Sequence, residues 1–290
     1  MDVRPSVRAG SFYEASPEMC RRHAESLLEA VELPEDLPGR LFGGILPHAG
    51  WVFSGGVAAR TLKALAAAGD VETLVLFGAD HTGAVRRGEV YDGGAWNTPL
   101  GDVEVDGKLA AAILAAGDCL RSNAGAHDLE HSIEVQVPLI QVLLPEAGIV
   151  PVAVPPTAIA VDIGRAVGKV IGAGFPRARV VGSTDLTHHG GHFGSPGGRG
   201  LTGVNWAVAN DRRMIEIIES MDAEKVIAEA EMRHNACGAG AIAATIAACM
   251  EMGASRAVVL EYTNSHEVMQ KSYPGGGDYT TVGYASVVFS

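Results

Sequence analysis

The chain has 290 residues, of which 47% are hydrophobic and 19% are charged, and its formal net charge is −12. Apolar side chains are numerous enough for a sizeable core, and 37 glycines and 14 prolines predict many turns. Because proteins bind nucleic acids by displacing counterions with Lys and Arg, the acidic balance argues against a nucleic-acid partner. The sequence shows neither a long apolar run nor the apolar stretch of a signal peptide at its start, so we expect a cytoplasmic protein with no membrane partner.

Short apolar runs alternate with turn residues and Ala-rich stretches, which is typical of βα units. In chain order we expect helix 17–31, strand 41–46, a helix from a cap at Ser54 to about residue 68, strand 73–77, helix 133–144, strand 149–154, helix 161–171, strand 179–182, helices 207–219 and 238–252, and strands 257–262 and 282–289. No repeat or charged linker divides the chain. The pattern therefore predicts one three-layer α/β domain over residues 1–290, with helices on both faces of a largely parallel or mixed sheet.

Three of the expected strands end in loops that carry histidines. His48 follows strand 41–46, His81 follows strand 73–77, and His188 and His189 follow strand 179–182 together with Asp185. The carboxyl ends of parallel strands lie at one edge of the sheet, where ligands bind, so these residues can meet. For His48 alone, a structural histidine bonded to a nearby carbonyl is an equally good interpretation. The equivalent placement of His81 favours a shared site.

The four cysteines are widely spaced and form no CxxC pair, so neither a disulfide framework nor a zinc knuckle is indicated. Cys237 immediately precedes an Ala-rich helix, where the helix dipole and free amides lower the pKa of a thiol and favour a metal-binding thiolate. Cys249 falls inside the same helix and is interpreted as a small core residue. Cys20 and Cys119 are also interpreted as structural.

Several polar residues near the expected strand ends are candidates for proton transfer or for support of a metal site. Asp185 and the imidazoles of His188 and His189 suit acid–base chemistry or orientation of a metal-bound histidine, and the sequence does not decide which imidazole faces inward. His131 and Glu134 belong to one motif, and for Glu134 a place in the first turn of a helix is as good an interpretation as a functional one. No nucleotide-binding glycine motif or serine-hydrolase elbow is present.

The glycine-rich segment 190–203 directly follows these histidines. Glycine-rich chain is conformationally free, so we expect a loop that covers the site and controls ligand access.

Five short motifs occur in order along the chain: Ala9-Gly10-Ser11-Phe12-Tyr13, Pro47-His48-Ala49-Gly50-Trp51, Glu130-His131-Ser132-Ile133-Glu134-Val135-Gln136, Asp185-Leu186-Thr187-His188, and Cys237-Gly238-Ala239-Gly240. Together they resemble the Memo family, also called AmmeMemoRadiSam system protein B, over about residues 4–289. The resemblance implies a fold like that of class III extradiol dioxygenases, which are non-haem iron enzymes. It also places the metal positions of the family, two histidines and a cysteine, on His48, His81 and Cys237, and matches a nearby polar pair with Asp185 and His188.

Three departures from the family pattern concern the substrate or partner rather than the metal. Ala79 and Asp80 precede His81 where the family often has Pro-Asn or Pro-Ser, Trp51 stands where Tyr is usual, and Ala239 stands where Arg is usual. The family name also implies a pathway association with radical-SAM and Ammecr-type proteins.

These observations leave three functional hypotheses. The first is a redox or oxygenase-like protein that holds iron or copper at His48, His81 and Cys237, with His188 moving protons. The second is a module that binds a peptide or small molecule without catalysis, although an acidic chain suits phosphopeptide capture poorly. The third is a zinc-dependent hydrolase with Asp185 or Glu134 as base. Apart from that role of Glu134, we expect His131, Glu134 and His189 to contact the substrate or to support the metal ligands.

Overall fold

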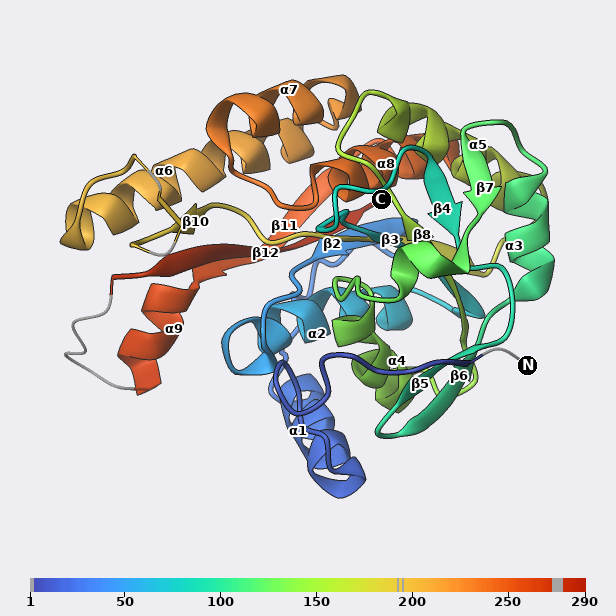
Figure 1. Ribbon diagram of the computed structural model, residues 1–290, viewed down its shortest axis with the longest axis horizontal. Helices are drawn as coiled ribbons and strands as arrows, with labels where there is room; N and C mark the ends of the chain where they lie inside the picture. Colours follow the sequence, from blue (N-terminus) through green and yellow to red (C-terminus); the bar gives the residue numbers. More distant parts are fainter. Residues whose placement is uncertain (1–2, 192, 195, 273–278) are drawn as a thin grey trace.

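The computed structural model describes residues 3–191, 193–194, 196–272 and 279–290. The main sheet has the strand order β10-β12-β2-β9-β3-β8-β4-β7, and β11 pairs with β12 (Figure 1). The centre of the sheet is parallel, because β2, β9, β3 and β8 run in one direction, whereas β12 and β4 are antiparallel to their neighbours β2 and β8. The strands are β2 (Gly43–Leu46), β3 (Thr73–Gly78), β4 (Gly88–Val90), β7 (Leu120–Ser122), β8 (Gly148–Ala153), β9 (Ala178–Ser183), β10 (His188–His189), β11 (Ala257–Asn264) and β12 (Thr281–Phe289).

A smaller sheet joins the N-terminal segment to the body of the molecule. It consists of β1 (Val3–Arg4), β5 (Ala95–Thr98) and β6 (Gly101–Glu104) in the order β1-β5-β6. The turn between β5 and β6 ends at Gly101, whose φ of 109° lies in the region that favours glycine.

Helices cover both faces of the main sheet, as Figure 1 shows with α5 and α8 above the sheet and α2 and α4 below it. On one face lie α3 (Gly107–Leu114), α5 (Ile159–Gly174), α6 (Gly200–Glu219), α7 (Ala223–Arg233) and α8 (Ala239–Glu251), and on the other lie α1 (Pro17–Glu29), α2 (Trp51–Ala67) and α4 (Val137–Leu143). The helix α9 (Ser265–Ser272) packs beside β12. Two short 3₁₀ turns cover Ala124–His127 and Glu134–Gln136.

The alternation of side chains along the central strands builds two apolar layers. In β3, Val75 and Phe77 enter the core under α5 and α8, whereas Leu74 and Leu76 enter the core over α1, α2 and α4. All four are buried, since a parallel sheet is covered on both faces. The α/β prediction, with a mixed sheet between helical layers, is confirmed. The extent of one domain over residues 1–290 stays a prediction.

Local sequence signals predicted most element boundaries to within a few residues of their positions in the structure, with some exceptions. The helix expected from Ser54 begins at Trp51 behind Gly50, and the Ser54 hydroxyl donates instead to the carbonyl of Ala49 at 3.0 Å. The helix expected over 133–144 starts as a 3₁₀ turn, and α4 begins at Val137 with Pro138 in its first turn. Within the described residues, no helix is both long and apolar enough to span a bilayer.

Candidate metal centre

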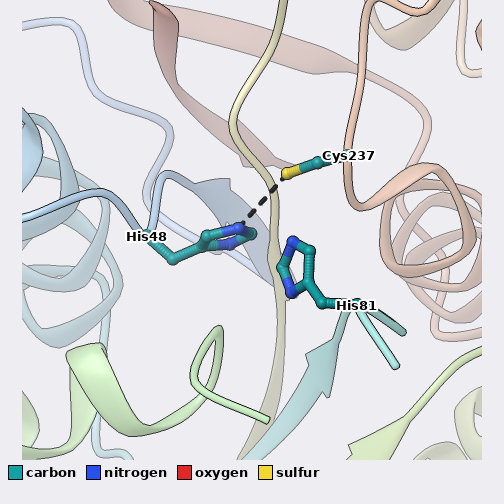
Figure 2. Close-up of side chains that lie close together, drawn as sticks. All are labelled: His48, His81 and Cys237. Atoms are coloured by element: carbon teal, nitrogen blue, oxygen red, sulfur yellow. Dashed lines mark hydrogen bonds between the residues drawn. The ribbon is translucent and has the colours of Figure 1, made fainter. Parts of the chain in front are cut away.

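His48 lies between β2 and α2 with only 2% of its surface exposed. Its ring Nδ1 is 2.9 Å from the hydroxyl of Ser183, and that hydroxyl donates its single proton to the carbonyl of Ser132 at 2.8 Å. Ser183 must therefore accept from Nδ1–H. Burial lowers the pKa of His48, so the ring is neutral and its other nitrogen, Nε2, carries no proton. This nitrogen lies 3.2 Å from the sulfur of Cys237 (Figure 2).

His81 follows β3 and is held by a carboxylate in the corresponding way. Its Nδ1 lies 3.0 and 3.1 Å from the two oxygens of Glu130, and its backbone amide donates to the same side chain at 2.9 Å. A carboxylate on one ring nitrogen fixes the orientation of the imidazole and makes the other nitrogen a better metal ligand. Burial lowers the pKa of His81, but the hydrogen bond and charge of Glu130 outweigh burial and raise that pKa above its usual value.

Cys237 lies just before α8, one residue ahead of the N-cap Gly238. Its backbone amide donates to the Asp185 carbonyl at 3.1 Å, and its sulfur accepts from the Asp185 amide at 3.3 Å. The pKa of the thiol is raised, chiefly by burial and then by the charge of Asp185, so the expectation of a lowered pKa was wrong. Desolvation outweighs the helix dipole at this position.

The three side chains reach one another from strand ends and a helix start that are far apart in the sequence. One ligand atom from each of His48, His81 and Cys237 lies within 4.8 Å of the other two, and Figure 2 shows a ring nitrogen of His81 turned toward the space between His48 and Cys237. Metal bonds of about 2.0–2.3 Å to nitrogen and sulfur are compatible with such separations. The donor set and its spacing therefore fit a transition metal.

Asp185 and His188 border the same space. Asp185 accepts from the His48 amide at 2.8 Å, and burial raises its pKa to about 7 against the opposing effect of the His48 and Ala49 amides. The Nδ1–H of His188 donates to the carbonyl of Leu186 at 3.1 Å, which leaves Nε2 without that proton, and burial lowers the pKa of the ring. A neutral His188 is thus able to accept a proton.

His131, Glu134 and His189 lie in three different settings. His131 stacks on His81, with ring centroids 4.7 Å apart and planes 24° apart. Glu134 pairs with Arg4 at 2.9 Å in a separate buried cluster. His189 packs against Trp206, with a centroid distance of 5.8 Å, and lies outside the pocket above the centre.

A second group, His81, Glu130 and His131, also has ligand atoms within 4.8 Å of one another. Imidazole lone pairs lie in the ring planes, so two nearly parallel stacked rings do not direct them at one ion. The oxygen Oε1 of Glu130 also accepts from the amides of His131 and Ser132 at 2.8 Å each. Glu130 is therefore a supporting residue of His81. The motif around Glu130 is visible in the sequence but does not indicate this role.

A pocket of about 580 Å³ opens above the centre. It is lined by residues of the N-terminal segment, of the strand-end loops and of α9 and β12, among them His48, His81, His131, Asp185 and His188. The segment 190–203 contributes Phe193 to this lining, whereas its last residues, from Gly200, belong to α6. Residues 192 and 195 of that segment lie outside the described residues.

The comparison with known proteins agrees with these observations. A family model described as Memo-like protein matches residues 4–288. The chain belongs to the Memo family. A MEMO1 family protein of Methanopyrus kandleri is 39% identical over 100% of this chain and 99% of its own length. Relatives from Methanothermobacter thermautotrophicus and Thermococcus kodakarensis are 38% and 36% identical, over 97% and 99% of this chain and 98% and 99% of their own lengths.

The family assignment confirms the resemblance drawn from the five motifs, and it covers almost the whole chain. The Memo family has a dioxygenase-like fold, in agreement with the mixed sheet between helical layers.

Proposed function

We propose that this protein binds one iron or copper ion through His48, His81 and Cys237 and uses it in redox chemistry on a small molecule. The observation that carries the proposal is the convergence of three soft or borderline donor atoms from separate elements. Hydrogen bonds to Ser183 and Glu130 hold the imidazole nitrogens that point away from this convergence. Sulfur and imidazole ligands select transition metals over magnesium or calcium.

The surrounding residues divide the remaining tasks. A bound iron or copper ion supplies one-electron chemistry and an open position for a ligand. His188 accepts a proton at Nε2, since its Nδ1–H is committed to Leu186. The carboxylate of Asp185 accepts from the backbone amide of His48, and the backbone amide of Asp185 donates to the sulfur of Cys237. Asp185 therefore helps to position two of the proposed ligands.

Zinc-dependent hydrolysis with Asp185 or Glu134 as the base is less well supported, because it needs an uncommitted carboxylate beside a metal-bound water. Glu134 is occupied by Arg4 and by the hydroxyl of Tyr13 at 2.7 Å. Asp185 carries backbone donors from His48 and Ala49. Neither carboxylate is positioned as an uncommitted base.

The test is metal analysis of the purified protein without added metal. We expect iron or copper near one equivalent per chain, with reversible oxidation and reduction followed by electron paramagnetic resonance. Cys237→Ser should lose the metal, because a serine hydroxyl is neither ionised at neutral pH nor soft. Zinc without redox activity would favour the hydrolase, and a metal-free wild type would favour a binding module.

Cys249→Ser is the matched control. Cys249 is fully buried in α8, the helix that Cys237 precedes, and it contacts the core rather than the site. Its substitution places a hydroxyl in an apolar environment and should cost on the order of 1–3 kcal/mol of stability. Metal content per folded chain should stay at the wild-type level. Equal metal content in both serine variants would remove Cys237 from the proposed site.

A further inference from the structure

We infer that Asn210 and Asp211 of α6 are positioning residues, which hold Thr187 and thereby decide that His188, rather than His189, faces the proposed metal centre. The inference rests on the proposed function for the role of His188 as the proton acceptor. It goes beyond that function because it assigns the orientation of this imidazole to a helix that contributes no metal ligand.

The orientation of the two histidines depends on the register of β10, which is only two residues long. His188 pairs with Val282 of β12, and His189 pairs with Thr281. Successive side chains of a strand point to opposite faces, so a slip by one residue would turn His189 toward the pocket and His188 away from it. Two residue pairs supply few hydrogen bonds to prevent such a slip. Contacts outside the strand must therefore fix its register.

Thr187, the residue before β10, is held at three of its polar groups. Its amide donates to the carboxylate of Asp211 at 2.7 Å, and its hydroxyl accepts from the side-chain amide of Asn210 at 3.1 Å. Its carbonyl accepts from the amide of Gly283 at 3.1 Å. Both side chains from α6 are buried, so water does not compete for these hydrogen bonds. The helix therefore fixes the point at which β10 begins.

The face of α6 that carries Asn210 also accommodates His189. Gly203 and Trp206 precede Asn210 by seven and four residues, a spacing that places all three on one side of the helix. The ring of Trp206 packs against that of His189, and a Cβ at position 203 would overlap Nε2 of His189. Figure 1 shows α6 beside β10. One helix face thus receives His189 and leaves His188 on the opposite side of the strand, in the pocket.

Asn210 also connects α6 to the segment that precedes Cys237. Its side-chain amide donates to the carbonyl of Arg233 at 3.0 Å, and its own carbonyl accepts from the side-chain amide of Asn235 at 3.0 Å. Asn235 is buried and lies two residues before Cys237. The helix is therefore fixed relative to the proposed centre at two points, the segment of His188 and the segment of Cys237.

The tautomer of His188 provides the test. Its Nδ1–H donates to the carbonyl of Leu186 at 3.1 Å, and Thr187 lies between these two residues, so the bond depends on the backbone that α6 holds. A single tautomer gives one protonated and one unprotonated ring nitrogen, whose ¹⁵N NMR shifts are well separated. We expect this pattern in the full-length protein at neutral pH, after exchange of any paramagnetic metal for zinc. His188→Gln identifies the signals by their loss.

Asp211→Ala removes the acceptor of the Thr187 amide. We expect His188 to lose its single tautomer in this variant, so that its two ¹⁵N shifts move toward each other. Asp211→Asn keeps an acceptor oxygen and should restore the wild-type pattern. His127 is the internal reference, because its Nε2 lies 2.9 Å from the carbonyl of Glu89 and its tautomer should not change in any variant.

Thr187→Val is a milder variant, which keeps the shape of the side chain and removes the acceptor of the Asn210 amide. We expect a smaller change of the His188 shifts in the same direction. Thr245→Val is the matched control, because the hydroxyl of this buried threonine donates to the carbonyl of Ala241 within α8. It should leave the His188 pattern unchanged. Chemical denaturation confirms that each variant is folded.

A wild-type His188 pattern in folded Asp211→Ala and Thr187→Val would overturn the inference. An equal change in Thr245→Val, or the same loss in Asp211→Asn as in Asp211→Ala, would also overturn it. The measurement needs neither iron nor copper, so a protein that binds neither metal still supports the inference if its variants behave as expected. A wild type that binds iron or copper but whose His188 ring exchanges between tautomers would contradict this inference alone.

Discussion

Glu130 and Glu134 come from one short segment and are equally inaccessible, with 2% and 1% of their surfaces exposed, yet they lie in different centres. Glu130 holds the imidazole of His81 beside Cys237 and His48. Glu134 holds the guanidinium of Arg4 at 2.9 Å. The two carboxylates come from one segment but bind different side chains.

The centre around Glu134 anchors the N-terminal segment. Both oxygens of Glu134 accept from the amide of Val7, at 2.9 and 3.0 Å, and one accepts from the amide of Arg8 at 2.8 Å and from the hydroxyl of Tyr13 at 2.7 Å. Every donor comes from the first residues of the chain. Burial of a carboxylate therefore does not mark a functional site, and the chemistry of its partner decides its role.

The largest effect is expected from Glu134→Ala. The substitution leaves the guanidinium of Arg4, whose side chain is 1% exposed, buried without its carboxylate, so the free energy of unfolding should fall by about 3–5 kcal/mol. Metal content per folded chain should not change, because Glu134 touches no proposed ligand. Chemical denaturation and metal analysis check both parts, and Glu134→Gln offers a milder variant. A loss of metal in protein that remains folded would contradict the separation of the two centres.

A third buried carboxylate, Asp211, extends the comparison because its contacts are neutral. It accepts from the amide of Thr187 and from the hydroxyl of Tyr262, each at 2.7 Å, and burial raises its pKa to about 6. A carboxyl whose pKa is raised on folding stabilises the fold when protonated, and this stabilisation is lost as pH rises from about 4 to about 6. The loss is on the order of 3 kcal/mol.

Asp211→Asn removes this titration. Denaturation midpoints measured between pH 4 and 7 should decline in the wild type over the lower part of this window and should be flatter in the variant. Parallel profiles in the two proteins would show that Asp211 does not titrate in this range.

The smallest expected effect comes from Glu130→Gln, which keeps the size of the side chain and removes its charge. Metal affinity should fall by about 10–100-fold, because the imidazole of His81 loses its carboxylate partner. Glu134→Gln is the matched control and should leave the affinity near the wild-type value. Competition titrations with a chelator measure both. Equal affinities in the two variants would mean that Glu130 is no more closely coupled to the metal than Glu134.

The sequence predicted the parallel centre of the sheet and the approach of His48 and His81, because βα units repeat and parallel strands end at one edge. It could not separate His188 from His189. In β10, adjacent side chains point to opposite faces, and His188 lines the pocket whereas His189 packs against Trp206.

Other features depend on contacts between distant residues, and no local pattern encodes them. Glu130 binds a ring 49 positions away, and Glu134 binds Arg4 at a separation of 130 positions. The sequence shows that Cys237 precedes a helix, but it does not show that the fold desolvates the thiol. The predicted direction of the pKa shift of Cys237 was therefore wrong. The short strands β4 to β7, of three or four residues each, are too brief for a periodic pattern.

The central claim is that His48, His81 and Cys237 bind one metal ion together. X-ray absorption spectroscopy of the metal-loaded protein tests it most directly, since sulfur and nitrogen neighbours of a metal are distinguishable by distance. We predict one sulfur at about 2.3 Å and nitrogen neighbours at about 2.0–2.1 Å, with the sulfur lost in Cys237→Ser and kept in Cys249→Ser. A spectrum with only nitrogen and oxygen neighbours in the wild type would contradict the claim.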